Sequence, residues 1–234
     1  MRWLTVPLMS LALLTGCGGG DDDTVAPVVP QPTVLDVDDS GTSSVSLTVL
    51  SQQLATLAVG TLTADEEAGL LYMREEEKLA RDVYLTMYNL WGQQVFENIS
   101  EAEETHAEAV KMLLDRYNLV DPVGSNGIGV FTDPQLQTLY DTLVNQGTTS
   151  LMEALYVGAA IEELDIFDLT AEEAKIENND DIALVYANLK KGSRNHLRAF
   201  YRNIIRAGGS YTPQYLTQAE FDAIVNSDFE RGSI

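Results

Sequence analysis

Residues 96–110 read FENISEAEETHAEAV, and this stretch decides the fold class. Phe96, Ile99, Glu103 and His106 recur at intervals of three and four residues, so in a helix they share one face. Two of these side chains are apolar and two can ionise. Ionisable groups on a buried face are costly unless they are paired or bound to a metal. The stretch therefore predicts a buried helix with polar chemistry at its middle.

The same spacing continues through most of the chain after residue 60, and capping signals mark the helix ends. No strand alternation and no internal repeat stands out. We expect helices from the capping box at Thr63 to about Trp91, from Val95 to Tyr117, from Asp133-Pro134 to Gly147, from Ser150 to about Asp168, from Asp180 to Ala207, and a small one after Thr217. This order predicts an all-α fold: an up-down-down-up four-helix bundle with a long crossover and a small C-terminal helix.

Ionisable residues interrupt the apolar stripe of each long helix at mid-length. They are Glu77 in the first helix, Glu103 and His106 in the second, Glu162 and Asp165 in the third, and His196 in the fourth. In a bundle these positions converge in one layer of the core. Four carboxylates balance the charge of two divalent ions, so such a layer is nearly neutral when dry. Mixed oxygen and nitrogen ligands favour two iron ions, with manganese or zinc as alternatives.

A reading without metal stays open. The histidines can be hydrogen-bonded core residues, and the carboxylates can pair with Arg81, Arg194 or Arg198. Acidic residues also flank Glu77 and Glu162, so a neighbouring glutamate can occupy the buried face of the helix instead. The same interruption on four helices favours the metal site.

Two of these stretches resemble known proteins. EKLARDVY, residues 77–84, resembles the first-helix motif of rubrerythrins and related ferritin-like proteins. Residues 96–110 are similar to their second-helix Glu-x-x-His segment, and Glu162-x-x-Asp165 matches their third-helix pair of acidic ligands. Residues 64–225 also resemble an uncharacterised ferritin-like family, domain of unknown function 2202, through LLYMREEEKLARDVY, VGAAIEELDI and GSRNHLRAF.

The resemblance implies a ferritin-like fold with a dinuclear metal centre. It implies terminal ligands at Asp165, His106 and His196, bridges at Glu103 and Glu162, and either role at Glu77. One position departs from the pattern, because Ser193 stands where ferritin-like diiron proteins have a fourth-helix glutamate. We expect Asp165 to replace that ligand; otherwise one metal site is weakened or a single ion binds. Tyr84 is expected as plain core, or as a hydrogen bonder or radical site beside the ligands.

Composition excludes several other functions. The 234 residues include 36 acidic and 14 basic side chains, and the formal net charge is −22. Binding to nucleic acid or anionic headgroups needs clustered Lys and Arg, so neither partner is expected. The single cysteine excludes an internal disulfide framework and any four-cysteine metal site.

The N-terminus reads as a targeting segment. Leu14-Thr15-Gly16-Cys17 resembles a bacterial lipobox, so residues 1–17 are predicted to be a signal peptide and lipobox with lipidation at Cys17. The alternative is a free buried cysteine after an ordinary signal peptide. No aspartate follows Cys17 directly, which favours lipid anchoring in the bacterial cell envelope at the outer membrane over the inner membrane.

Residues 18–60 are predicted to be a flexible, acidic and Pro-rich tether, and residues 61–234 the bundle domain. Residues 36–41 imitate the start of an EF-hand loop, but Leu47 stands where the loop requires glutamate. We therefore expect a solvated linker there.

These observations predict an envelope-anchored diiron protein that reacts with Fe(II) and dioxygen or peroxide, as a ferroxidase or peroxidase does. Turnover would need an external electron donor, because the chain has no second redox domain. A monomer or dimer is expected. The alternative is a non-catalytic metal-binding or scaffold lipoprotein with a degenerate site, which Ser193 favours. The sequence does not decide whether the protein is an enzyme.

Overall fold

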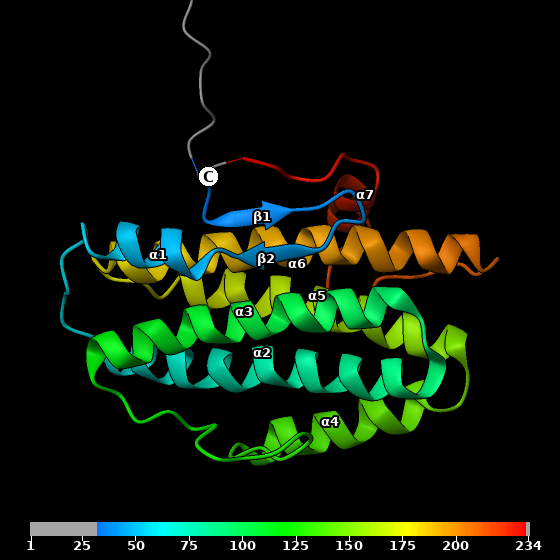
Figure 1. Cartoon of the computed structure of the whole chain (residues 1–234), viewed down its shortest axis with the longest axis horizontal. Coiled ribbons are helices and arrows are strands. Elements are labelled where there is room, and N and C mark those ends of the chain that lie inside the picture. Colours follow the sequence, from blue (N-terminus) through cyan, green and yellow to red (C-terminus); the bar gives the residue numbers. More distant parts are fainter. Residues whose placement is uncertain (1–31, 233–234) are drawn as a thin grey trace, which may run out of the picture. The chain divides into compact units, whose positions relative to one another are not determined.

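The computed structural model describes residues 32–232. This part of the chain is mostly helical, which confirms the all-α prediction (Figure 1). The elements are β1 (Leu35–Val37), β2 (Ser43–Val45), α1 (Leu47–Leu54), α2 (Ala64–Trp91), α3 (Gln94–Tyr117), α4 (Pro134–Gly147), α5 (Leu151–Glu173), α6 (Asp180–Arg206) and α7 (Gln218–Val225).

The helix ends follow the capping signals. The Glu66 N–H donates to the Thr63 hydroxyl at 3.2 Å, and the Glu66 carboxylate accepts from the Thr63 N–H at 2.8 Å, which closes the predicted capping box of α2. The same helix stops at Gly92, whose φ of 62° is left-handed. Helix α5 runs past the expected end at Asp168, because Leu169 is still buried and no stop signal precedes Ala174.

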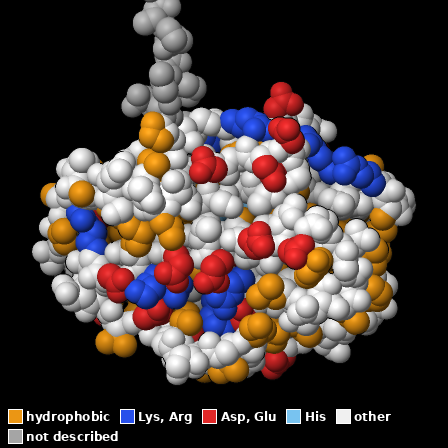
Figure 2. Space-filling view, in the orientation of Figure 1, with side chains coloured by type: hydrophobic (Ala, Val, Ile, Leu, Met, Phe, Trp, Pro, Cys, Tyr) orange, Lys and Arg blue, Asp and Glu red, His pale blue; other side chains and the backbone are white. Residues whose placement is uncertain are grey.

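The long helices pack in pairs. Helix α2 lies against α3, α5 lies against α6, and the pairs meet through α2 with α5 and α3 with α6 (Figure 1). The short helix α4 covers α2 and α5 from outside. Arg81 of α2 pairs with the exposed Glu104 of α3, and the buried Arg74 of α2 pairs with Glu108 of α3. Figure 2 shows acidic and basic side chains lying together on the surface.

Two apolar clusters form the core. One contains Leu79, Tyr84, Phe96, Leu155 and Phe200, and the other contains Leu70, Met73, Val110, Leu113 and Leu189. Along α2, α3 and α6 the interrupting ionisable residues lie between the parts that contribute to the two clusters; along α5 they lie near the end of the first cluster, before Leu169 of the second. Both ends of the polar layer are therefore covered by packed apolar side chains, which exclude water.

The prediction of a flexible tether over residues 18–60 is wrong for the described residues from 32 onward. Strands β1 and β2 form an antiparallel hairpin in which Leu35 pairs with Val45, and α1 follows directly. Leu35, Val45 and Leu50 are buried, so this segment gains apolar contact that its composition did not suggest. The Pro-rich residues 18–31 and the lipobox with Cys17 lie outside the described residues.

The stretch that imitates an EF-hand is the turn of this hairpin. One Asp38 carboxylate oxygen accepts hydrogen bonds from the N–H groups of Ser40, Gly41 and Thr42 at 2.8, 2.9 and 3.0 Å. Gly41 has a φ of 96°, a conformation that glycine adopts without strain. The acidic residues thus build a turn rather than a solvated linker.

Candidate metal centre

All six predicted ligands lie in one layer of the core. Helix α2 supplies Glu77, α3 supplies Glu103 and His106, α5 supplies Glu162 and Asp165, and α6 supplies His196. Each of the six is at most 1% exposed. The three-residue spacing within α3 and α5 turns both members of each pair inward, as the sequence predicted.

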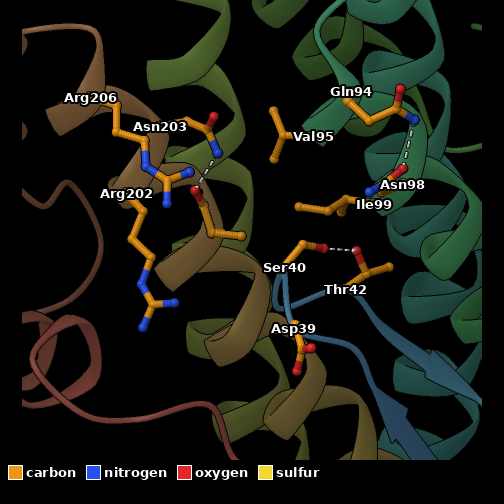
Figure 3. A pocket seen from close by; sticks show the side chains of 11 residues that line it. Asp39, Ser40, Thr42, Gln94, Val95, Asn98, Ile99, Arg202, Asn203 and Arg206 are labelled. Carbon is orange, nitrogen blue, oxygen red and sulfur yellow. Dashed lines mark hydrogen bonds between the residues drawn. The ribbon is translucent and has the colours of Figure 1, made fainter.

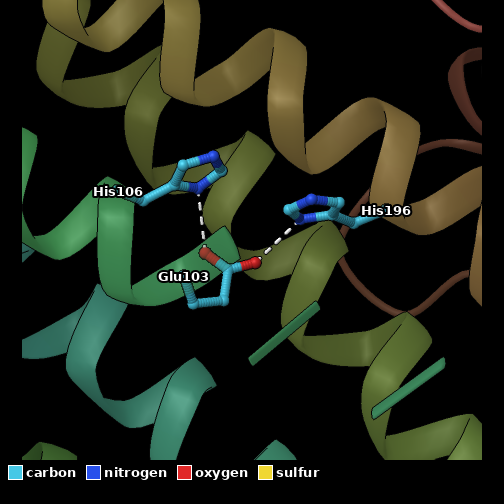
Figure 4. A group of neighbouring side chains, drawn as sticks. All are labelled: Glu103, His106 and His196. Carbon is cyan, nitrogen blue, oxygen red and sulfur yellow. Dashed lines mark ion pairs between the residues drawn. The ribbon is translucent and has the colours of Figure 1, made fainter. Parts of the chain in front are cut away.

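Glu103 is the centre of this layer (Figure 4). One carboxylate oxygen lies 2.9 Å from His106 Nδ1, and the other lies 2.8 Å from His196 Nδ1. The two imidazole rings stack with centroids 5.3 Å apart and planes 19° apart. The ligand atoms of these three residues all lie within 4.8 Å of one another, so this buried group could hold a metal ion.

Glu77 lies next to one histidine of this group and Glu162 next to the other. A Glu77 oxygen lies 3.5 Å from His106 Nδ1, and a Glu162 oxygen lies 3.5 Å from His196 Nδ1. The Tyr84 hydroxyl donates to the other Glu162 oxygen at 2.6 Å. Tyr84 is thus both core and hydrogen bonder, and it fixes the carboxylate that faces His196.

Asp165 completes the set but touches no donor. Both of its oxygens, and both oxygens of Glu77, are buried without a hydrogen-bond partner among the described residues. Burial, and then the carboxylates of Glu76 and Glu77, raise the pKa of Asp165 well above its usual range. A buried carboxylate without a donor is unfavourable unless a proton or a cation joins it, so the donor set fits a metal ion.

The electrostatics follow from burial and from the shared Glu103. Burial raises the pKa of Glu77 to about 8 and that of Glu162 to about 7, against the opposing effect of the histidines. Burial would also raise the pKa of Glu103, but His106 and His196 outweigh it and lower that pKa. Metal ligands must be deprotonated, so an ion bound here by Glu77 and Glu162 would displace their protons.

The arginines named in the reading without metal have other partners. Arg81 pairs with Asp82 and Glu104, while Arg194 and Arg198 both pair with Glu230. Ser193 donates its hydroxyl to the Leu189 carbonyl at 3.1 Å, as a buried helical serine often does. The position where ferritin-like diiron proteins carry a glutamate therefore offers no carboxylate.

Two residues of this layer escaped the sequence analysis as contributors. The Ser43 N–H donates to His196 Nε2 at 3.0 Å, and the Ser43 carbonyl lies 2.8 Å from His106 Nε2. Glu76 is 1% exposed, both of its oxygens lack a donor, and Asp168 faces it. The run of three glutamates at 75–77 signalled Glu76, whereas nothing in the sequence marked Ser43.

The fold and the site together define the class of this protein: it is mostly helical and contains a buried Glu-His-His group that could hold a metal ion. The family model "Uncharacterized protein domain (DUF2202)" matches residues 66–228, and the chain belongs to this family.

A known protein and a solved structure are similar to the chain. "Uncharacterized protein MJ0754" of Methanocaldococcus jannaschii is 51% identical over 181 residues, which are 77% of this chain and 97% of that protein. The crystal structure of hypothetical protein MJ0754 from Methanococcus jannaschii is 52% identical, covers 74% of this chain and 99% of its own, and has a TM-score of 0.73.

These findings correct one prediction. The sequence predicts a lipid-anchored protein of the bacterial cell envelope, but the similar protein comes from an archaeon, which contradicts that localisation. Within residues 32–232, no helix combines the length and apolarity that crossing a bilayer requires.

Proposed function

We propose that this protein is a ferritin-like four-helix bundle that binds two divalent metal ions and oxidises Fe(II) with dioxygen or peroxide. Iron is the favoured metal, and manganese and zinc are the alternatives. The observation that carries the proposal is the convergence of four buried carboxylates and two imidazoles, several of whose atoms lack any donor. Such a set is costly in the fold unless cations join it.

The arrangement of the helices supports the fold part of this proposal. Helices α2, α3, α5 and α6 are the long ones, and residues 118–150 with α4 connect the second to the third. A long connection at this place suits an up-down-down-up bundle, because it returns the chain to the same end before α5 begins. Each helix then contributes ligands at mid-length.

The charge and the donor types support iron. Four carboxylates offset the charge of two divalent ions in a layer that packed side chains keep dry. Imidazole and carboxylate together suit iron and manganese, and imidazole also suits zinc. Bound iron supplies one-electron chemistry between its ferrous and ferric states.

The protein's own residues hold and shield this layer. Tyr84 orients Glu162, Glu103 joins both histidines, and the two apolar clusters exclude water from either end. Fixed ligand geometry and a dry, shaped cavity are what a protein contributes to a metal site. An external reductant would complete turnover.

A pocket of about 210 Å³ lies between the hairpin, α3 and α6, and its lining includes Thr42, Ile99 and Ala199 (Figure 3). Ile99 is about one helical turn along α3 from Glu103, and Ala199 is about one turn along α6 from His196. The six predicted ligands are not among its lining residues. As part of this proposal, a small oxidant would approach the layer from this pocket.

The second candidate function is a metal-binding protein without catalysis. Ser193 favours it, because the missing carboxylate weakens the ligand set of one ion. Under this proposal the protein binds one ion and oxidises nothing.

Metal titration of the full chain with Glu103→Gln and Glu104→Gln separates these functions. Glu104 neighbours Glu103 on α3 but is a surface residue that pairs with Arg81. We expect E103Q to abolish Fe(II) binding and oxidation, and E104Q to leave both unchanged. Wild-type protein that binds Fe(II) but leaves it reduced under oxygen and peroxide supports the second function. Equal behaviour of E103Q and wild type contradicts both.

A further inference from the structure

The N-terminal hairpin, residues 34–45, lies against the metal layer although it precedes the residues that the family model matches. That match begins at residue 66. Strand β2 packs on α3 and α6, the helices that carry the two histidines. Asn195 Nδ2 donates to the Ser43 hydroxyl at 2.9 Å, and the Val45 N–H donates to the Thr105 hydroxyl at 2.7 Å. The hairpin is thus bound to both helices next to the site.

The backbone N–H and the backbone carbonyl of Ser43 each form a hydrogen bond with one of the two histidines. The carbonyl accepts from His106 Nε2 at 2.8 Å, which requires a hydrogen on that nitrogen. The N–H donates to His196 Nε2 at 3.0 Å, which requires a lone pair on that nitrogen. Ser43 therefore requires a hydrogen on Nε2 of one ring and a lone pair on Nε2 of the other, although both rings contact Glu103 in the same way through Nδ1.

The geometry points to Ser43 as a positioning residue that makes the two histidines unequal. The Ser43 carbonyl holds a hydrogen on Nε2 of His106, which leaves Nδ1 as the nitrogen that would bind an ion, whereas the Ser43 N–H holds the hydrogen of His196 on Nδ1. This inference rests on the proposed metal site, because only a metal makes the inequality functional. In neutral imidazole one nitrogen is a donor and the other an acceptor, so each Ser43 contact selects one tautomer.

Glu103 faces Nδ1 of both rings, at 2.9 Å from His106 and 2.8 Å from His196, and in the metal-free protein its carboxylate can accept a hydrogen from either nitrogen. At His106 a hydrogen on Nε2 meets the Ser43 carbonyl, so this ring can carry hydrogens on both nitrogens without losing a contact. At His196 a hydrogen on Nε2 would point at the Ser43 N–H and break that hydrogen bond. The geometry therefore favours a single hydrogen on His196, at Nδ1.

The consequence is a stepwise order of metal loading. An ion at His106 Nδ1 would replace any hydrogen shared there with Glu103 and would leave the contact between Nε2 and the Ser43 carbonyl in place. A neutral imidazole that binds an ion through Nδ1 carries its hydrogen on Nε2. An ion at His196 Nδ1 would therefore shift that hydrogen to Nε2, and the Ser43 N–H would have to withdraw. The second ion would then bind more weakly and loosen the hairpin.

The test is nitrogen-15 NMR of the imidazoles in the metal-free full chain. The sequence contains only two histidines, so two ring spin systems report everything. We expect a hydrogen on Nε2 of His106, and a hydrogen on Nδ1 but not on Nε2 of His196. A hydrogen on Nε2 of His196 in the metal-free wild type overturns the inference.

Two variants at Ser43 refine the test. Ser43→Pro removes the N–H donor and keeps the carbonyl, while Ser43→Ala keeps both groups and is the matched control. One ordinary hydrogen bond corresponds to roughly a fivefold change in an equilibrium. We expect S43P to shift the His196 tautomer ratio toward Nε2–H by about that factor, with His106 unchanged and S43A like wild type. An unchanged His196 ratio in folded S43P contradicts the inference, and the wild-type spectrum decides if S43P does not fold.

Zn²⁺ titration of the same samples separates this inference from the proposed function. We expect S43P to bind the second Zn²⁺ about fivefold more tightly than wild type and the first equally well. If the tautomers are as expected but the protein binds no Zn²⁺ at any concentration, the proposed metal site is refuted. Zn²⁺ binding with the wrong tautomers refutes the role of Ser43 alone.

Discussion

Gly192 of α6 makes room for the His106 ring. A Cβ atom at this position would lie 2.6 Å from His106 Cε1 and 2.8 Å from its Nε2. The ring would have to move by about 1 Å to regain ordinary van der Waals contact. Because Nε2 is 2.8 Å from the Ser43 carbonyl, a movement of this size breaks the hydrogen bond that orients the ring.

The Gly192→Ala substitution therefore tests this packing. Overpacking a core typically costs about 1–3 kcal/mol, whereas replacing glycine by alanine inside a helix contributes about 1 kcal/mol in the opposite direction. Losing the partner that orients a metal-binding histidine typically weakens metal affinity roughly 10- to 100-fold. We expect G192A to be less stable by about 1 kcal/mol on balance and to bind the first metal ion at least about tenfold more weakly.

The assays are denaturant unfolding in the presence of a chelator and calorimetric titration with Zn²⁺. Gly127→Ala, in the connection between α3 and α4, is the control for an added methyl group that meets nothing, because a Cβ atom there has no neighbour within 4 Å. The reasoning is refuted if G192A becomes more stable by the full helix-propensity gain and binds Zn²⁺ as wild type does.

Three further substitutions test the electrostatics. Asp165→Asn should raise the free energy of unfolding of the metal-free protein by about 1 kcal/mol or more, because it removes a buried carboxylate without a donor. The same substitution should weaken Zn²⁺ binding. If denaturation shows lower stability and calorimetry shows unchanged Zn²⁺ binding, Asp165 is not a ligand. Tyr84→Phe should lower stability by about 1–3 kcal/mol, because it leaves Glu162 without its donor at 2.6 Å, and unchanged denaturation midpoints would contradict that contact. Burial would raise the pKa of Glu230, but Arg194 and Arg198 outweigh it and lower that pKa to about 2. Its contribution to stability is therefore complete above the ordinary pKa near 4.5 and is lost as the pH falls toward 2, so Glu230→Gln should flatten the acid side of a stability–pH curve; an unaltered curve would show that this ion pair is not coupled to folding.

The helices could be predicted because their signals are local. The capping box at Thr63, the Asp133-Pro134 start of α4 and the cap at Ser150 each fix a helix end within a few neighbouring residues. The candidate site could be predicted for a related reason, since mid-helix ionisable residues at three-four spacing must either face one another or face water.

The hairpin could not be predicted by the same reasoning. Its strands are three residues each, and the acidic turn between them has the composition of a linker. What holds it in place is long-range: Ser43 contacts His196 from 153 residues away, and Arg231 donates to the carbonyls of Val37 and Asp38. No local pattern records such contacts.

The sequence only partly predicts which of three adjacent glutamates in α2 faces the candidate site. Glu75, Glu76 and Glu77 are all buried, each for a different reason. Glu75 accepts from the N–H groups of Thr132 and Asp133, Glu77 faces His106, and Glu76 faces Asp168. Three adjacent residues point in three directions on a helix, so only the partners supplied by the whole fold separate their roles.

Anaerobic titration of the full chain with Fe(II), followed by exposure to peroxide under an absorbance monitor, tests the central claim most directly. The proposed function predicts two equivalents bound and then oxidation to a ferric species with strong near-ultraviolet absorbance. Fewer than two equivalents without any oxidation would contradict it.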